Sequence, residues 1–132
     1  MPNTLIDIFK LFVRSAVEPA VPLWSGAIIE KEKNGIEKVQ KTAMKLISGS
    51  SYRDYIGSLK KFNLDTLDPR RKKICLKFAK NCTKNDRFKH WFKLKPPPNT
   101  RYKDKYLRPK TNTKRYAKSS IPYLTELLNE NE

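Results

Sequence analysis

The sequence predicts an all-α fold: a small bundle of about four helices, a basic and largely irregular C-terminal tail, and a short terminal helix. Apolar residues recur with the helical period in successive segments, and helix start and stop signals separate these segments. Three consecutive prolines at 96–98 then precede a stretch without apolar periodicity. We therefore expect a helical domain over 1–93, a basic extended segment over 94–119 and a short acidic helix over 120–132.

The first helix is expected to open near Thr4 and to weaken at Pro19. Its charged residues share one polar stripe: Asp7, Lys10, Arg14 and Glu18. The apolar residues around this stripe predict a mostly buried helix. Because charges interrupt the segment and the opening "MPNT" has no basic residue, we expect neither a membrane span nor an export signal. The expected location is cytoplasmic or nuclear, with no membrane partner.

A bend and the longest helix are expected next. Pro22 and Trp24 mark the bend, with the indole packed onto neighbouring helices. Apolar positions over 29–47, interrupted at Asn34-Gly35, predict the helix, and its exposed side carries Lys38, Lys41 and Lys45. Glu37 and Lys41 have the spacing of a stabilising ion pair. The lysines fit a solvated face or a face that contacts phosphates, and both alternatives stay open.

Two further helices follow. A short one is expected to start at Ser51, followed by Asp54, and to run through about Phe62, and a basic one is expected from an Asp68 N-cap to Cys82. In the basic helix, the residues assigned to the buried face are Ile74, Cys75, Phe78, Ala79 and Cys82. The candidate phosphate contacts on and around it are Arg70, Arg71, Lys73, Lys77 and Lys80. The two arginines would lie near the positive end of the helix dipole, where a bound phosphate would offset the repulsion of their charges.

After a helical turn or two over 85–92, with three aromatic residues turned toward the core, the tail mixes tyrosines with cations. Such a composition cannot bury a core, so we expect the tail to order on a partner. The candidate phosphate contacts are Arg101, Arg108, Lys114 and Arg115, and the candidate base-stacking residues are Tyr102, Tyr106 and Tyr116. The alternative, that the tyrosines fasten the tail to the domain, fits equally well.

Charge is strongly segregated along the 132 residues. The net charge is +16, and residues 67–118 hold 19 Lys and Arg against 3 Asp and Glu. Such an excess favours a polyanionic partner, of which nucleic acid is the commonest, because bound phosphates displace condensed counterions. The alternative is a basic surface without a dedicated partner. We expect RNA, DNA or their hybrid as the partner.

No catalytic site is predicted. His90 is the single histidine, and we find no nucleophile arrangement, glycine-rich phosphate loop or carboxylate pair. Cys75, Cys82 and His90 do not have the spacing of a zinc site, so the cysteines are expected to be free core thiols. We therefore expect no metal, no cofactor and no enzymatic activity of the chain by itself.

The order of several segments resembles a known family. These are "LFVRSAVEPAVPLWSG", "IEKVQKTAMKLISG", "FNLDTLDPRRKKICLKFAKNC" and, after the prolines, "NTKRYAKSSIPYLTELLNE". Together they resemble the C-terminal part of reverse transcriptases of jockey-like non-LTR retrotransposons. The most specific pieces are Pro22 with Trp24, "IEKVQK" from Ile36, and the "L-x-T-L-x-x-R-R" pattern that ends at Arg71.

This resemblance implies a thumb and post-thumb region that grips the template-primer duplex, with the palm of the polymerase as a further partner. The chain departs from the family at Pro19, where relatives place an aromatic residue. It also lacks the "Y-x-D-D" element that carries the palm aspartates of an RNA-directed DNA polymerase. We expect a nucleic-acid-binding fragment; the alternative is a stand-alone interaction protein that docks through its apolar helices.

Overall fold

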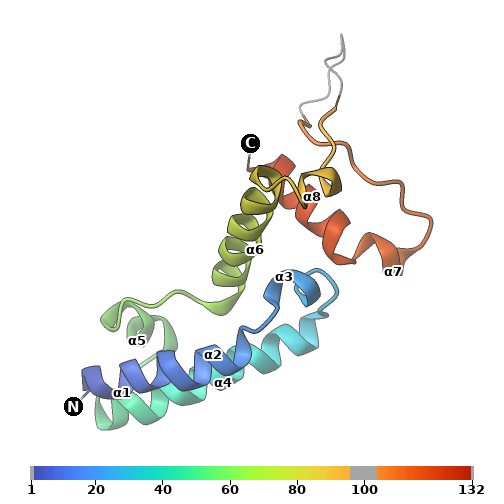
Figure 1. Cartoon of the computed structure of the whole chain (residues 1–132). Coiled ribbons are helices and arrows are strands. Elements are labelled where there is room, and N and C mark those ends of the chain that lie inside the picture. The colour runs from blue at the N-terminus through green and yellow to red at the C-terminus, as the bar shows by residue number, and fades with distance from the viewer. Residues whose placement is uncertain (1, 96–103, 132) are drawn as a thin grey trace. The chain divides into compact units, whose positions relative to one another are not determined.

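The protein is all-α in the computed structural model, which describes residues 2–95 and 104–131 (Figure 1). Its elements are α1 (Pro2–Ile8), the π-helical η1 (Phe9–Arg14), α2 (Ser15–Val17), α3 (Val21–Trp24), α4 (Glu30–Ser48), η2 (Gly49–Ser51), α5 (Tyr55–Lys61), α6 (Leu67–Lys84), η3 (Lys89–Trp91), α7 (Lys114–Ala117) and α8 (Ser120–Glu130). The predicted class is confirmed. The predicted count was loose, since five α-helices in the described residues have seven residues or more.

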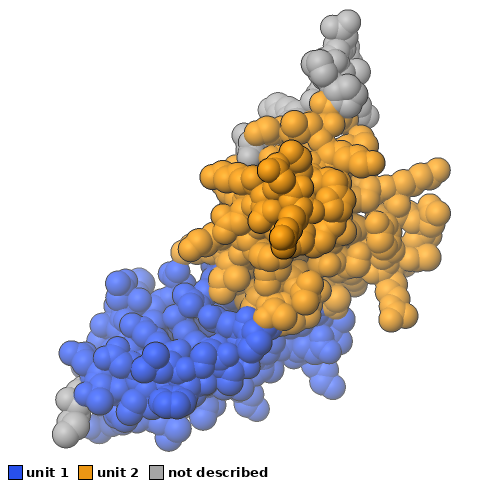
Figure 2. Space-filling model, in the orientation of Figure 1, with its two compact units in different colours: residues 1–19, 28–70 blue, residues 20–27, 71–132 orange. Residues whose placement is uncertain are grey.

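The chain divides into two compact units, which Figure 2 shows in different colours. Unit 1 comprises residues 1–19 and 28–70, and unit 2 comprises residues 20–27 and 71–132. This division differs from the predicted boundaries at 93 and 119. The reason is that α8 and the segment before it share one hydrophobic core with α6, so they do not form separate regions.

In unit 1, the continuous run of α1, η1 and α2 lies along α4 (Figure 1). The buried core of the unit is Ile6, Phe9, Met44, Leu59 and Leu64. α4 runs without a break through Asn34 and Gly35, where the sequence pattern predicted an interruption. Gly35 therefore lies inside a helix, where its flexible backbone lowers helix stability.

The prediction of a mostly buried first helix was wrong. Ile6 and Phe9 are buried, but Leu11 and Phe12 are 68% and 69% exposed. Ile6 and Phe9 pack with Met44, Leu59 and Leu64, so only one narrow stripe of the described part of this helix lies in the core. Arg14, assigned to the outer polar stripe, is instead buried at 7% exposure. The helix also begins at Pro2, so Thr4 is not its N-cap.

Both α5 and α6 start at other residues than predicted. The Asp54 side chain caps α5 by accepting the backbone N–H of Gly57 at 2.8 Å, whereas Ser51, the expected start, lies in the separate turn η2. α6 begins at Leu67, one residue before the predicted Asp68 cap. A carboxylate oxygen of Glu37, on α4, accepts the Leu67 N–H at 3.0 Å and so satisfies a donor that the helix itself leaves unpaired.

Unit 2 is built around one apolar cluster. Its buried members are Val21, Cys75, Ala79, Cys82, Phe92, Tyr106, Leu124, Leu127 and Leu128. Trp24 packs against this cluster, as expected for the bend. The bend also comes very close to α8: a Cβ atom on Gly26 would lie 2.7 Å from two side-chain atoms of Tyr123. Only glycine fits this approach without a shift of its neighbours.

The tail does not follow its predicted character in the described residues. Tyr106 is buried at 6% exposure and belongs to the core of unit 2. Its backbone N–H donates to Asn129 Oδ1 at 2.9 Å, and its carbonyl accepts from Asn129 Nδ2 at 3.1 Å. An antiparallel bridge pairs Tyr106 with Leu94 as well. α8 docks back as expected, and it ties down a segment that we predicted to order only on a partner.

The aromatic residues over 85–92 also differ from the prediction. Phe92 is buried at 3% exposure, but Phe88 and Trp91 are each 36% exposed. Their ring centroids lie 4.8 Å apart, so these two rings pack mainly on each other. Phe88 and Trp91 are three residues apart and so lie on the same side of the 3-10 turn, whereas Phe92, just after the turn, belongs to the core.

Candidate nucleic-acid interface

The charge of the chain is concentrated in unit 2. Its residues hold 18 Lys and Arg against 5 Asp and Glu, a net charge of +13, whereas unit 1 holds 11 against 8, a net charge of +3. The units therefore differ in how strongly they attract a polyanion. The attraction falls off within about 10 Å at moderate salt, so the positions of the individual cations decide what each unit can hold.

α6 is the main basic helix, and its charge is ordered by its packing. Cys75, Ala79 and Cys82 face the core, with spacings of four and three residues. The opposite side carries an exposed row that we call the lysine stripe: Lys73, Lys77, Lys80 and Lys84. Eleven residues of helix place these four side chains along about 16 Å. Because the face with Cys75, Ala79 and Cys82 is buried, the lysine stripe on the opposite face points toward solvent.

The two arginines before the stripe do not act as predicted. Arg70 forms a two-point ion pair with Glu18, with its Nε against Oε1 and its Nη2 3.1 Å from Oε2. Hydrogen bonding to Glu18 raises the pKa of Arg70. Arg71 is buried at 3% exposure. Neither arginine is therefore presented as an open phosphate ligand, because Arg70 is paired with Glu18 and Arg71 is buried.

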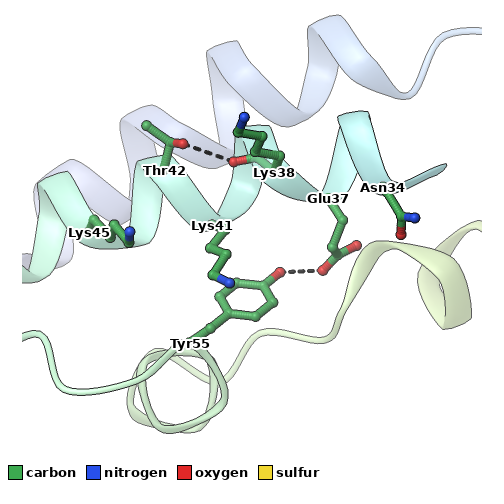
Figure 3. Close-up of a pocket in the computed structure, with 7 residues that line it drawn as sticks. All are labelled: Asn34, Glu37, Lys38, Lys41, Thr42, Lys45 and Tyr55. Atoms are coloured by element: carbon green, nitrogen blue, oxygen red, sulfur yellow. Dashed lines mark hydrogen bonds between the residues drawn. The ribbon is translucent and has the colours of Figure 1, made fainter. Parts of the chain in front are cut away.

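Three lysines of α4 border a hollow in unit 1 of about 430 Å³ (Figure 3). We call it the lysine hollow, and its lining residues are Asn34, Glu37, Lys38, Lys41, Thr42, Lys45 and Tyr55. The predicted ion pair between Glu37 and Lys41 is absent from the described residues. Glu37 instead accepts hydrogen bonds from the Tyr55 hydroxyl and the Leu67 backbone. Its charge is therefore already engaged, and the lysines dominate the open side.

Behind the lysine hollow lies a buried polar network. Gln40 Nε2 donates to the Tyr55 hydroxyl at 2.9 Å and to the carbonyl of Asp65 at 3.1 Å. Arg14 Nη2 donates to Gln40 Oε1 at 3.3 Å. Burial, followed by the hydrogen bond to Glu37, raises the pKa of Tyr55, and burial lowers the pKa of Arg14. The network holds the wall of the hollow in one arrangement.

The tail candidates divide into four groups, of which the last is formed by the residues of α7. Arg101 and Tyr102 lie outside the described residues. Arg108 Nε is 2.9 Å from a carboxylate oxygen of Asp104, and this contact raises its pKa. Tyr106 is buried, so its assignment as a base-stacking residue was wrong and its fastening role is the one observed.

α7 keeps its candidate residues accessible. Lys114, Arg115 and Tyr116 are all exposed, with Tyr116 at 45%. Thr113 caps this short helix by accepting the Tyr116 backbone N–H at 3.1 Å. The cap places two cations and one aromatic ring on a single turn, which suits contact with a phosphate and a base.

Sequence reasoning placed Lys84 on the basic face of α6, seven residues from Lys77, but did not include it among the candidate phosphate contacts. The buried pair of Arg14 and Gln40 was missed. Gln40 lies four residues before Met44 on the core side of α4, and a polar residue at such a position signals a buried hydrogen-bond partner.

Within the part of the chain that the structure describes, no helix is long and apolar enough to cross a membrane. No group of three or more His, Cys, Asp or Glu in those residues could hold a metal ion. No protein-family model, curated protein or solved structure matches the chain. The resemblance to reverse transcriptases therefore stays a prediction, supported by the order of the sequence segments alone.

Proposed function

We propose that the chain binds the backbone of RNA, DNA or an RNA-DNA hybrid, as a nucleic-acid-gripping piece similar to the thumb and post-thumb of a jockey-like reverse transcriptase. The observation that carries the proposal is the lysine stripe. It places four exposed ammonium groups on one face of an 18-residue helix whose other face is fixed in a core. Lysines arranged in a row suit successive phosphates of a strand, which repeat at regular intervals.

The test measures how binding depends on salt. A labelled 20-nucleotide strand is titrated by fluorescence anisotropy at several salt concentrations, with the wild type and the triple variant Lys77→Gln, Lys80→Gln and Lys84→Gln. If each lysine contacts a phosphate, the slope of log affinity against log salt falls by about 2 for a single strand. The same titration with duplex and hybrid identifies the preferred polyanion.

A matched control removes the same charge elsewhere. Lys31, Lys33 and Lys60 belong to unit 1 and lie outside both the lysine stripe and the lysine hollow. Changing these three to Gln lowers the net charge equally. The proposal predicts a much smaller change in slope than for the stripe variant. Equal changes for the two triple variants would sink it, because net charge and not the stripe would then govern binding.

A second candidate function rests on a different observation. η1 exposes Leu11 and Phe12, whose side chains are each more than two-thirds accessible. Large exposed apolar side chains on one helix favour the interaction protein, docking through its apolar helices. This candidate predicts that Phe12→Ser abolishes capture of a protein partner without changing the affinity for nucleic acid. The triple variant of the lysine stripe would instead lower the affinity for nucleic acid and leave capture of the protein partner unchanged.

A further inference from the structure

The lysine hollow differs from the lysine stripe because it is a concave site. Its volume of about 430 Å³ falls in the range of small-ligand pockets and exceeds what one phosphate needs. In Figure 3, Lys41 and Glu37 extend from α4 toward Tyr55, while Lys38 and Thr42 project from the other side of the same helix. The cations that line the hollow therefore project in different directions and do not meet at one point.

The spacing along α4 limits the kind of ligand. Lys38 and Lys45 are seven residues apart, which corresponds to two turns and about 10 Å of helix. Lys41 lies between them along the helix, three residues from Lys38 and four from Lys45. A ligand that carries two phosphate groups, directly linked or one nucleotide apart, can engage Lys41 together with one of the outer lysines.

The polar groups around the cations are partly engaged within the protein. The Thr42 hydroxyl donates to the carbonyl of Lys38 at 2.9 Å, so its oxygen can accept a hydrogen bond from a sugar or base of the ligand. Asn34 offers both an amide donor and an acceptor. The Glu37 carboxylate, which would repel an anion, accepts hydrogen bonds from the Tyr55 hydroxyl and the Leu67 N–H. The ring of Tyr55 is held in place by these same bonds.

We infer that the lysine hollow binds a ligand of nucleotide size with at least two phosphate groups, held by Lys41 and by Lys38 or Lys45. Two sources share this chemistry: consecutive phosphodiesters of a nucleic-acid strand, and the polyphosphate of a free nucleotide. In its strand form the inference rests on the proposed function. In its nucleotide form it is independent of the lysine stripe.

The experiment is an NMR titration of the ¹⁵N-labelled full chain at low salt with three probes. They are a thymidine trinucleotide, its uncharged methylphosphonate analogue, and ADP. The inference predicts saturable shifts of the α4 amides around Lys41 with the trinucleotide, with ADP or with both, and none with the uncharged analogue. Saturation by the trinucleotide alone identifies a strand as the ligand, and saturation by ADP alone identifies a free nucleotide. If neither probe saturates these amides, the inference is wrong.

Variants make the assignment specific. Lys41→Gln is expected to raise the dissociation constant about tenfold, the loss that corresponds to one charge-assisted contact. Lys41→Arg should keep the affinity within about threefold, because the charge is retained. The control is Lys31→Gln, an exposed lysine of the same helix outside the hollow, for which less than a twofold change is expected. Equal weakening by Lys31→Gln and Lys41→Gln would overturn the inference.

Failure of the hollow and failure of the proposed function are distinguishable. The lysine stripe is tested with a 20-nucleotide strand and variants in unit 2, and the hollow with short probes and variants in unit 1. A chain that keeps its salt-dependent strand binding but shows no saturation at α4 refutes the hollow alone. A chain that saturates with ADP but shows no stripe-dependent binding refutes the proposed function alone.

Discussion

Replacing Gln40 by Leu is expected to destabilise the protein by about 2–4 kcal/mol. The side chain is 1% exposed and stands between three polar partners. Its Nε2 donates to the Tyr55 hydroxyl at 2.9 Å and to the carbonyl of Asp65 at 3.1 Å, and its Oε1 accepts from Arg14 at 3.3 Å. Leucine has a similar volume, so the substitution removes hydrogen bonds without opening a large cavity.

The magnitude follows from what each partner loses. The Tyr55 hydroxyl still donates to Glu37, and the carbonyl of Asp65 keeps a weak contact with Arg14 at 3.4 Å. These two losses cost about 1 kcal/mol each. The buried guanidinium of Arg14 loses an acceptor, which costs a further 1.5–3 kcal/mol or so, as for hydrogen bonds to charged groups. The added apolar surface of leucine offsets roughly 1 kcal/mol of this sum.

The assay is urea denaturation followed by circular dichroism at 222 nm. Met44→Leu, one turn further along α4 at a fully buried position, is the control for a change of shape in the core and should cost less than about 1.5 kcal/mol. A Gln40→Leu variant within about 0.5 kcal/mol of the wild type would refute the reasoning. It would show that apolar packing replaces the network at no net cost.

Three further predictions concern other parts of the molecule. Gly26→Ala should lower the free energy of unfolding by about 1–3 kcal/mol, because its Cβ would lie 2.7 Å from atoms of α8. Gly35→Ala, which has open space around it inside α4, should raise the free energy of unfolding by about 0.5–1 kcal/mol. Thermal melts of the two variants test both expectations. Cys75 and Cys82 should react with a thiol reagent only as fast as the protein unfolds, since burial raises both thiol pKa values; rapid labelling of the native protein would contradict this expectation. Burial raises the pKa of Tyr55 above its ordinary value of about 10, so its contribution to stability is complete below that pH and is lost as the pH rises. Urea midpoints measured between pH 9 and about 11 should therefore fall more steeply for the wild type than for Tyr55→Phe.

Local sequence signals predicted the helices well, because each depends on neighbouring residues. The apolar periods of α4 and α6 and the short terminal helix α8 follow from spacing within a few residues. The start of α6 was missed because its first N–H is satisfied by Glu37, 30 residues earlier in the chain. No local pattern at Asp68 reveals a partner at that distance.

The exposure of a candidate residue could be predicted from the sequence where it depends only on the helix face that the residue occupies. Lys77 and Lys80 are exposed, because the period that buries Cys75 turns them outward. Arg70 and Tyr106 were misassigned because each has partners from distant segments: Glu18 for the arginine, and Asn129 together with the core for the tyrosine. Composition tells how many cations a segment holds, but only tertiary contacts decide which of them face solvent.

The pairing of Asn129 with Tyr106 has a practical consequence for shortened versions of the protein. One amide near the end of α8 satisfies both backbone groups of a residue 23 positions earlier, as a neighbouring strand would do in a sheet. Trimming the chain at residue 128 would leave that backbone unpaired and loosen a ring that belongs to the interior. Expression boundaries should therefore include Asn129, and a purification tag is better joined after residue 131 than in place of the last turn.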